Sequence, residues 1–391
     1  MRYSRFRGRG LPNIGTVSKK PNATSDAKPP TKSAQPNPPA GEASSPKPRY
    51  SRTQVNAAGD ALIAPSSSLE VLRSARSAVN NWRAAHSLPL DSVLMELQQR
   101  VAAFGEDAVV AARLKRLFSI EAKLRRFRSM QLARMQDVGG CRVVLPSVAD
   151  VLGIAGRYDS EPSPHAVINS NDYIAEPRAS GYRGVHLVSR FRPEGEEQAV
   201  YEGMRIEVQL RSRLQHIWAT AVETVGTFSG QTLKSSAGDG QWLRLFALMG
   251  SEMAFAEDRP LVPGTPKTRQ ALREELSEVA HGVDAVARLE RYRETLRVLE
   301  GHVRNGKAEY FHIVVDSMPD DVARVRWNEY AEHEREEAIL AFEEVEAAIE
   351  HFPGADTVLV RVASIDTLRD AYPSFFADTR VFVDQLKCAI G

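Results

Sequence analysis

The stretch "MRIEVQLRSRLQHIWATAVETV", residues 204–225, places a strand pattern directly before a helix pattern. In its first half apolar and polar residues alternate, as they do in a strand with one buried face. The second half predicts a helix. The polar face of the strand carries Glu207, Gln209 and Arg211, which form either the solvent side of an antiparallel strand or the floor of an active cleft.

The segments around this stretch predict more strands mixed with helices. Residues 68–104 have apolar residues at helical spacing, with a Pro-containing turn between two helices. Short apolar strands follow in "GCRVVLP" near residue 140 and "GVHLVSRF" near residue 185. We therefore predict an α/β (α+β) fold, in which a mixed β-sheet is flanked by helices.

The last third of the chain predicts a small C-terminal α/β module. After a turn-rich segment, residues 267–303 are typical of a helix, 308–317 of a strand, 321–352 of a long acidic helix and 356–364 of a strand. The acidic helix carries Glu343, Glu344 and Glu346. These glutamates either cover a basic active-site surface of the same chain or form a solvated face of the helix.

Composition excludes several classes of protein. The chain has 391 residues, of which 42% are hydrophobic, so it can bury real cores. Its two cysteines, Cys141 and Cys388, are too few for a disulfide framework or a cysteine-based zinc site. No stretch is apolar enough for a membrane span, and the basic N-terminus lacks the apolar core of a secretory signal. We expect a soluble, cytoplasmic protein without a membrane partner.

The N-terminal segment has the composition of a disordered basic tail. Residues 1–55 carry eleven Lys and Arg against two acids, and the middle of this stretch has almost no large apolar residues. Such a tail either touches RNA loosely or keeps the protein soluble. The predicted organisation is a tail over residues 1–65, a first domain over 66–260 and a C-terminal module over 261–391.

A basic segment followed by a single acid suggests a polyphosphate and magnesium site. Residues 112–134 hold eight Lys and Arg against one acid, and Asp137 follows in a glycine-containing turn. Ser119 is placed to cap a helix, whose N-terminus would favour phosphate oxygens. The residues for which we favour phosphate binding are Arg113, Lys115 and Lys123. For others a solvated or RNA-facing helix is at least as good an interpretation: Arg125, Arg128 and Arg134.

The loop "NDYIAEPRASGYRGVH", residues 171–186, is polar, turn-prone and aromatic at once. Such a loop suits a surface that stacks a flat ligand and hydrogen-bonds its edges. It is also what an ordinary connection between two strands looks like. His186 correspondingly is either a site residue or a neutral core histidine.

Four ordered blocks resemble the RelA/SpoT synthetase domain: "RLKRLFSIEAKL", "DVGGCRVVL", "DYIAEPRASGYRGVH" and "IEVQLRSRLQHIWA". The resemblance implies transfer of pyrophosphate from ATP to the ribose 3′-hydroxyl of GDP or GTP, which makes (p)ppGpp and AMP. It also implies a sheet distantly like that of nucleotidyltransferases.

The resemblance further implies a role for each matched residue. It makes Asp137 and Glu207 the catalytic acids and the ligands of Mg²⁺, with Glu207 also taking the proton of the 3′-hydroxyl. The ATP phosphates or base would be held by Arg113, Lys115, Ser119, Lys123 and Arg142. The acceptor nucleotide would be bound by Tyr182, whose ring stacks on the base, with Asp172, Arg178, Gly181, His186, Gln209, Arg211 and His216.

Departures from the family pattern leave the acceptor open. Arg178 replaces the usual lysine, and Gly184 with Val185 replaces a serine-containing pair. Some members of this superfamily are toxins that pyrophosphorylate the 3′ end of tRNA, so tRNA is the alternative acceptor, with the C-terminal module as the neutralising part. A third hypothesis is that the protein is a nucleotide-binding module without catalytic activity. No His-Asp dipeptide occurs, so we expect no hydrolase domain. Self-association and an unidentified regulator of the C-terminal module are left open.

Overall fold

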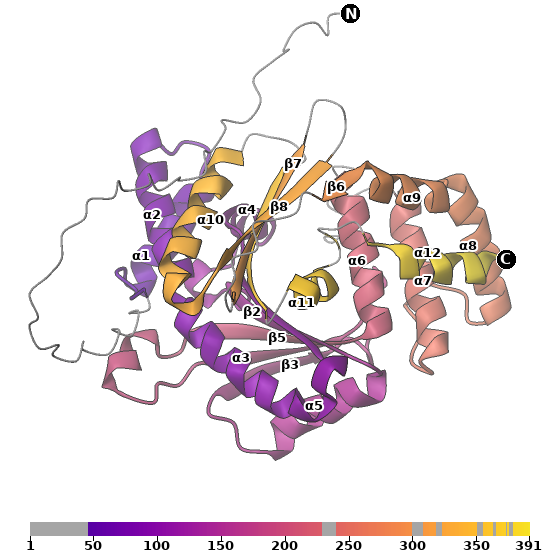
Figure 1. Cartoon of the computed structure of the whole chain (residues 1–391), viewed down its shortest axis with the longest axis horizontal. Helices are drawn as coiled ribbons and strands as arrows, with labels where there is room; N and C mark the ends of the chain where they lie inside the picture. The colour runs from indigo at the N-terminus through magenta and orange to yellow at the C-terminus, as the bar shows by residue number, and fades with distance from the viewer. Residues whose placement is uncertain are drawn as a thin grey trace, which may run out of the picture. The chain divides into compact units, whose positions relative to one another are not determined.

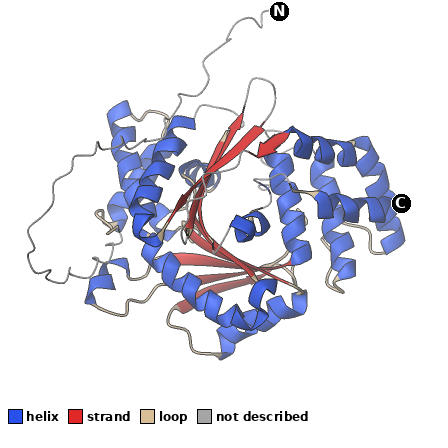
Figure 2. Ribbon diagram, viewed as in Figure 1, coloured by secondary structure: helices blue, strands red, loops and turns tan. Residues whose placement is uncertain are grey.

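The computed structural model describes residues 46–228, 240–298, 308–317, 323–349, 355–362, 365–372, 374 and 378–391. These residues build a sheet with helices on its faces, which confirms the predicted α/β class (Figures 1 and 2). Most of the predicted tail, residues 1–45, lies outside the described residues.

Within the described residues the strands form one sheet in the order β3-β4-β5-β2-β1-β9-β7-β8-β6. Parallel pairing joins β2 to β5 and β6 to β8, and the other neighbours are antiparallel, so the sheet is mixed. The strands are β1 (Val109–Leu114), β2 (Gly139–Leu145), β3 (Ala166–Asp172), β4 (Val185–Arg190), β5 (Arg205–Ser212), β6 (Leu296–Val298), β7 (Tyr310–Ser317), β8 (Ala323–Tyr330) and β9 (Asp356–Arg361).

Helices fill the connections of this sheet and form a separate layer beside it. The α-helices are α1 (Arg52–Ile63), α2 (Leu69–Ala85), α3 (Ser87–Val101), α4 (Leu117–Arg126), α5 (Val148–Ser160), α6 (Arg213–Phe228), α7 (Gly240–Ala256), α8 (Arg269–Gly282), α9 (Ala285–Thr295), α10 (Arg335–Ile349), α11 (Ile365–Ala371) and α12 (Arg380–Ile390). Short 3₁₀ turns span Ala102–Asp107, Leu132–Arg134, Glu196–Tyr201 and Glu332–Glu334. Helices α7, α8, α9 and α12 lie together at one end, to the right in Figure 1.

One face of the central strands is apolar, and it packs on α3 and α5. Ile206, Val208 and Leu210 of β5 share a core with Cys141 and Val143 of β2 and with apolar residues of those two helices. The alternation read from residues 205–211 is therefore confirmed, and it leaves the opposite face of β5 and β2 to polar side chains. Helix α11 lies on that opposite face (Figure 1).

The C-terminal strands continue the first sheet instead of forming a sheet of their own. Ala112 and Arg113 of β1 pair with Arg361 and Val360 of β9. A buried ion-pair group supports this junction, because the Asp91 carboxylate of α3 lies 2.6 Å from Arg361. The predicted boundary at residues 260 and 261 thus does not separate two sheets, since a free edge of β1 is a ready partner for β9.

Two further expectations are corrected by the structure. Helix α1, with Ser51 as its N-cap, lies inside the predicted tail over residues 1–65, because Val55 and Leu62 pack into a core with α2. Within the described part of the expected acidic helix over residues 321–352, strand β8 comes first, since buried Val325 and Trp327 alternate with their neighbours, and the α-helical part is α10. In the described parts of the chain, no helix is long and apolar enough to cross a bilayer.

Candidate functional site

The polar face of β5 is the floor of the site, and its neighbours follow from strand register. Gln209 lies opposite Arg142 of β2 and His186 of β4, and Glu207 lies opposite Gly140 of β2. Arg113 of β1 in turn pairs with Gly140. Because residues in register on one face are neighbours, the fold gathers these side chains from four strands. Of the two interpretations of this polar face, the cleft floor is the one that the structure supports.

Glu207 is held in an ionised state by its neighbours. His186 Nδ1 lies 3.1 Å from Glu207 Oε1, and Gln209 Nε2 donates to Glu207 Oε2 at 2.6 Å. Burial raises the pKa of Glu207, but the hydrogen bond and charge of His186 outweigh it and lower the pKa to about 2. Burial likewise lowers the pKa of His186, whereas Tyr182 and Glu207 raise it to about 9. A charged His186 donates from both ring nitrogens.

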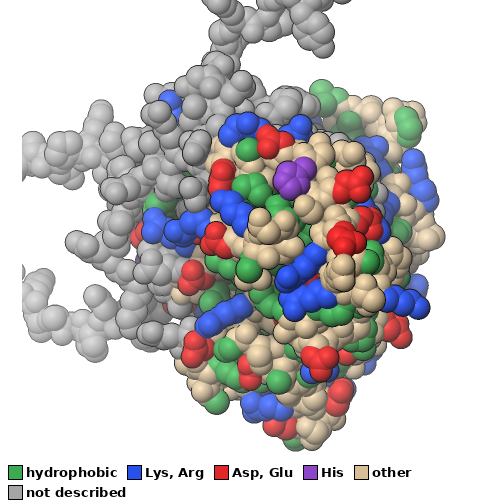
Figure 3. Space-filling model, turned by 90° about the vertical axis from the view of Figure 1, so that its right-hand side faces the viewer, with side chains coloured by type: hydrophobic (Ala, Val, Ile, Leu, Met, Phe, Trp, Pro, Cys, Tyr) green, Lys and Arg blue, Asp and Glu red, His purple; other side chains and the backbone are tan. Residues whose placement is uncertain are grey.

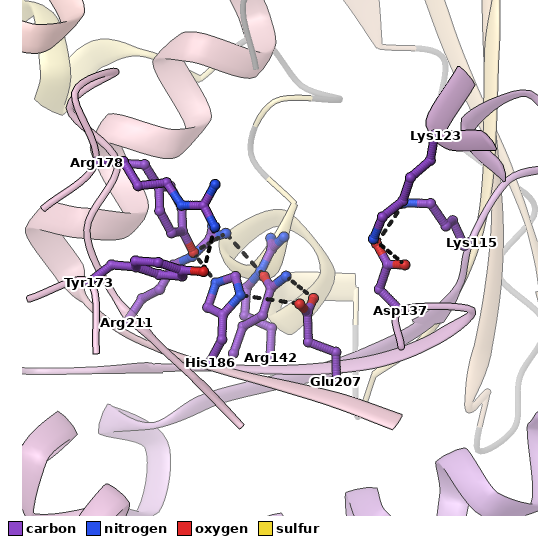
Figure 4. Close-up of polar contacts among 11 residues, drawn as sticks. Lys115, Lys123, Asp137, Arg142, Tyr173, Arg178, His186, Glu207 and Arg211 are labelled. Atoms are coloured by element: carbon purple, nitrogen blue, oxygen red, sulfur yellow. Dashed lines mark hydrogen bonds and ion pairs between the residues drawn. The ribbon is translucent and has the colours of Figure 1, made fainter. Parts of the chain in front are cut away.

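The second acid, Asp137, is paired with two lysines. Lys115 Nζ and Lys123 Nζ donate to its two carboxylate oxygens, each at 2.9 Å (Figure 4). Burial raises the pKa of Asp137, and the two lysines lower it overall. The negative charge of Glu207 acts to raise the pKa of Asp137, so the two carboxylates are close enough to influence each other's ionisation.

Ser119 does not cap a helix. Helix α4 begins at Leu117, three residues earlier than a Ser119 cap requires, and its N-cap residue Arg116 makes no side-chain capping bond. Arg113 lies in β1, and Lys115 directly follows the last residue of that strand.

Five side chains cluster where β4 begins and β5 ends, and we call them the acceptor cluster after the role that the resemblance predicts for four of them: Tyr173, Arg178, Tyr182, His186 and Arg211. The rings of Tyr173, Tyr182 and His186 meet edge to face, with centroids 5.3–5.8 Å apart. Arg178 covers the Tyr173 ring at 4.2 Å, and Arg211 covers the Tyr182 ring at 5.2 Å. Figure 4 shows this cluster and the Lys115, Lys123 and Asp137 group on opposite sides of Glu207.

The Tyr182 ring is half-buried, not fully exposed, and its hydroxyl is engaged. Arg211 Nη2 donates to the hydroxyl at 3.2 Å, and His186 Nε2 also bonds to it. Gly181 has φ +97°, and a Cβ there would lie 2.5 Å from the Phe246 carbonyl oxygen of α7. The glycine therefore permits a close approach of the loop to α7, in addition to the turn that the sequence suggested.

The remaining predicted acceptor residues are placed differently. Asp172 Oδ1 accepts from the backbone N–H groups of Ile174 and Ala175, so this carboxylate stabilises the loop. His216 of α6 donates from Nε2 to the Asp370 carbonyl oxygen at 2.9 Å and therefore contacts the C-terminal part of the chain. Within the described residues, buried Nη1 of Arg211 has no hydrogen-bond partner, which leaves a donor for a ligand.

A closing segment, residues 365–372, lies over the arginines of the floor. Arg142 Nη1 donates to the Ala371 carbonyl oxygen at 3.2 Å. The guanidinium carbons of Arg142 and Arg113 lie 5.3 and 5.9 Å from the centre of the Tyr372 ring, whose side chain is 1% exposed. The cavity lined by these residues, Asp137 and Glu207 has a volume of about 50 Å³, which holds only a few water molecules.

The acidic helix α10 makes a second contact with the basic segment. Glu346 Oε1 accepts from the backbone N–H of Leu117 at 2.6 Å, and Glu346 Oε2 lies 2.8 Å from Arg83 Nη1. A carboxylate thus occupies the N-terminus of α4, where the helix dipole and free N–H groups favour an anion. Of the three glutamates considered from sequence, Glu346 is the one that binds there. Tyr372 was not among the predicted site residues, and its signal in the sequence is the aromatic-rich "AYPSFF", which lies outside the matched blocks.

Comparison with known proteins identifies the part of the chain that carries these residues. The sequence model of a family described as a region found in RelA/SpoT proteins matches residues 112–227. We call residues 112–227, which match this model, the RelA/SpoT region. This RelA/SpoT region runs from β1 to α6 and contains the floor, both acids and the acceptor cluster, whereas the closing segment and α10 lie outside it.

Relatives of the RelA/SpoT region include GTP pyrophosphokinase YjbM of Bacillus subtilis, 32% identical over 117 residues that cover 28% of this chain and 52% of the relative. An uncharacterized protein of Mycobacterium tuberculosis is 31% identical over 146 residues, which cover 36% of this chain and 48% of that protein. The match thus spans about half the length of these relatives. The small alarmone synthetase 1 of B. subtilis, solved with its product pppGpp, gives a TM-score of 0.39 at 21% identity, covering 46% of this chain and 94% of the other.

Proposed function

We propose that the protein is an ATP-dependent pyrophosphotransferase that moves the β,γ-pyrophosphate of ATP to the ribose 3′-hydroxyl of GDP or GTP and releases AMP. The observation that carries the proposal is the pair of ionised acids, Asp137 and Glu207, which line one cavity of the RelA/SpoT region. The name of the B. subtilis relative, GTP pyrophosphokinase, supports the same reaction.

Each side of the site would have its own chemical role in this reaction. Lys115 and Lys123 would neutralise ATP phosphates after they release Asp137, and Arg113 and Arg142 would hold the ATP base on their planar guanidinium groups. Tyr182, with the donors of His186 and Arg211, would hold the acceptor base and sugar. In-line placement of the two substrates is the main demand of such a transfer.

Asp137 and Glu207 fit a magnesium ion. Both carboxylates are ionised and line the same cavity, and Mg²⁺ is usually held by one or two carboxylates together with phosphate oxygens and waters. Bound there, the ion would neutralise charge that develops on the transferred phosphates. Among the described residues there is no group of three or more such ligands, so substrate oxygens would have to complete the coordination.

The chemical step forms a bond between the 3′-oxygen and the β-phosphorus and breaks the bond between the β-phosphorus and the oxygen that leaves on AMP. Glu207 would accept the proton of the 3′-hydroxyl. Its low pKa makes it a weak base, but a loose transition state requires little proton transfer before the phosphorus–oxygen bond forms.

The C-terminal part of the chain would hold this activity in check. Tyr372 lies against the two arginines assigned to the ATP base, and Glu346 lies at the helix N-terminus beside the assigned phosphate residues. ATP would therefore bind only after the closing segment, residues 365–372, moves away. An activity kept closed within one chain favours the second candidate, a toxin that pyrophosphorylates the 3′ end of tRNA.

The test is to incubate the full chain and a Tyr372→Ala variant with γ-labelled ATP and, separately, GDP, GTP or tRNA. Label on GDP or GTP, with AMP formed in equal amount, would support the alarmone synthetase. Label on the tRNA 3′ end would support the second candidate. Absence of label on all three acceptors, with the variant folded by circular dichroism, would refute both.

A further inference from the structure

Four arginines from separate elements gather beyond Glu207 on the site face of the sheet, and we call them the arginine cluster: Arg52, Arg134, Arg190 and Arg205. Arg190 and Arg205 are direct cross-strand partners at the ends of β4 and β5. On these strands the pairs Arg190 with Arg205, Val188 with Glu207 and His186 with Gln209 alternate onto one face. The arginine pair therefore continues the floor one step beyond Glu207.

Within the described residues, none of these four arginines makes an ion pair with a carboxylate. Arg205 Nη1 donates to the Arg134 carbonyl oxygen, and Arg52 Nη2 donates to that of Glu202, so both contacts are to neutral backbone. Burial and then the three neighbouring arginines lower the pKa of Arg205, and no carboxylate acts against them. By contrast, Arg244 on α7 is paired with Glu275.

Like charges placed directly opposite each other on a sheet destabilise it. Arg134 and Arg190 are exposed, so water reduces this cost but does not remove it. An unpaired group of guanidinium forks at the edge of an active site is what phosphate groups bind best. On the face of the molecule shown in Figure 3, by contrast, basic and acidic side chains are interspersed.

We propose that the arginine cluster binds phosphate groups of the acceptor, on the side of its ribose away from Tyr182. This rests on the proposed function, which places the acceptor base at Tyr182 and the reacting 3′-oxygen at Glu207. One step along a strand face is about 6.6 Å, which is of the same order as the distance from a ribose 3′-oxygen to its 5′-phosphate. The phosphates are either the 5′-phosphates of a free nucleotide or the backbone of an RNA whose 3′ end enters the site.

The test uses the double variant Arg134→Gln/Arg190→Gln in the full chain. Both side chains are exposed, and no hydrogen bond or ion pair of either is seen in the described residues, so the fold should be unaffected. The matched control is Arg288→Gln, which removes a positive charge from exposed α9. Direct binding of labelled GDP, GTP and tRNA is measured at several salt concentrations, together with ATP binding.

For a nucleotide acceptor, the double variant should bind GDP or GTP about tenfold more weakly, since hydrogen bonds to charged groups are the strong ones. For an RNA acceptor, tRNA binding should weaken and its salt slope should fall by about 0.7 for each phosphate contact removed. ATP binding should stay unchanged in both cases.

Two outcomes would overturn the inference while leaving the proposed function intact. One is acceptor binding that matches the Arg288→Gln control for all three acceptors. The other is a loss confined to ATP, which would assign the cluster to the donor. If the wild-type chain transfers no label but the double variant still loses acceptor binding, the proposed reaction fails and the phosphate-binding surface stands.

Discussion

The two halves of the site differ in what fills them. In the acceptor half, Tyr182, His186 and Glu207 already bond to one another within the RelA/SpoT region, and Arg211 keeps a free donor. In the donor half, Arg113 and Arg142 lie against Tyr372, which comes from a part of the chain outside that region. On the proposed function, the acceptor half would be organised before a ligand arrives, whereas the donor half would have to exchange a side chain for its ligand.

This difference suggests a division of labour. Preorganised polar groups act on a substrate without reorganisation during the reaction. A donor half that has to open adds a conformational equilibrium, and the apparent affinity for ATP falls by the fraction of open molecules. Specificity and chemistry would then belong to the RelA/SpoT region, and control to the C-terminal part.

The largest effect should come from the acids that serve both halves. We expect Asp137→Asn or Glu207→Gln to reduce transfer by 10²-fold or more, because each removes a charge needed next to the phosphates. The measurement is label transfer in a Tyr372→Ala background, so that closure does not hide the loss. A variant that keeps more than about a tenth of the turnover, with an unchanged melting curve, would remove that acid from the mechanism.

Opening the donor half should give the next largest effect. If the closed form holds about 90–99% of the molecules, Tyr372→Ala should tighten ATP binding about 10- to 100-fold, measured by calorimetry. Loss of a buried aromatic ring also costs stability, so the matched control is Phe382→Ala, which empties a buried site in α12. Equal ATP affinity in the Tyr372→Ala and wild-type proteins would mean that Tyr372 does not close the site.

Tyr182 tests the acceptor half by itself. Because its ring would stack on the acceptor base, Tyr182→Ala should lose roughly 1–3 kcal/mol of the free energy of acceptor binding. Tyr182→Phe should lose about 1 kcal/mol, since its hydroxyl bonds to His186 and Arg211. Acceptor and ATP affinities are measured in the same titrations. A Phe variant that binds its acceptor as well as wild type would show that the hydroxyl contacts are incidental.

The smallest effect concerns Glu346, the second contact of the C-terminal part. Glu346→Gln keeps the shape but removes the charge at the N-terminus of α4, an interaction worth about 0.3–1 kcal/mol. ATP binding should therefore tighten two- to fivefold. Glu344→Gln on the same helix is the control, because that exposed side chain makes no contact seen in the described residues. If the two variants behave alike, the Glu346 contact does not oppose ATP.

The sequence predicted the acceptor half better than the donor half, for a physical reason. Strand alternation alone places Glu207 and Gln209 on one face, and the matched blocks supply Tyr182 and His186. Tyr372 could not be found this way, because its burial depends on tertiary packing of a distant segment. The Ser119 cap was wrong because α4 starts after Arg116, a residue type that capping preferences do not indicate, which leaves Ser119 inside the first turn.

The central claim, transfer to a 3′-hydroxyl, is tested most directly by comparing GDP with 3′-deoxy-GDP. The Tyr372→Ala protein is incubated with γ-labelled ATP and either nucleotide, and the labelled products are separated. Our account predicts a labelled guanosine product with GDP and none with 3′-deoxy-GDP. Equal labelling of the two nucleotides, or failure of GDP, GTP and tRNA alike to accept label, would contradict it.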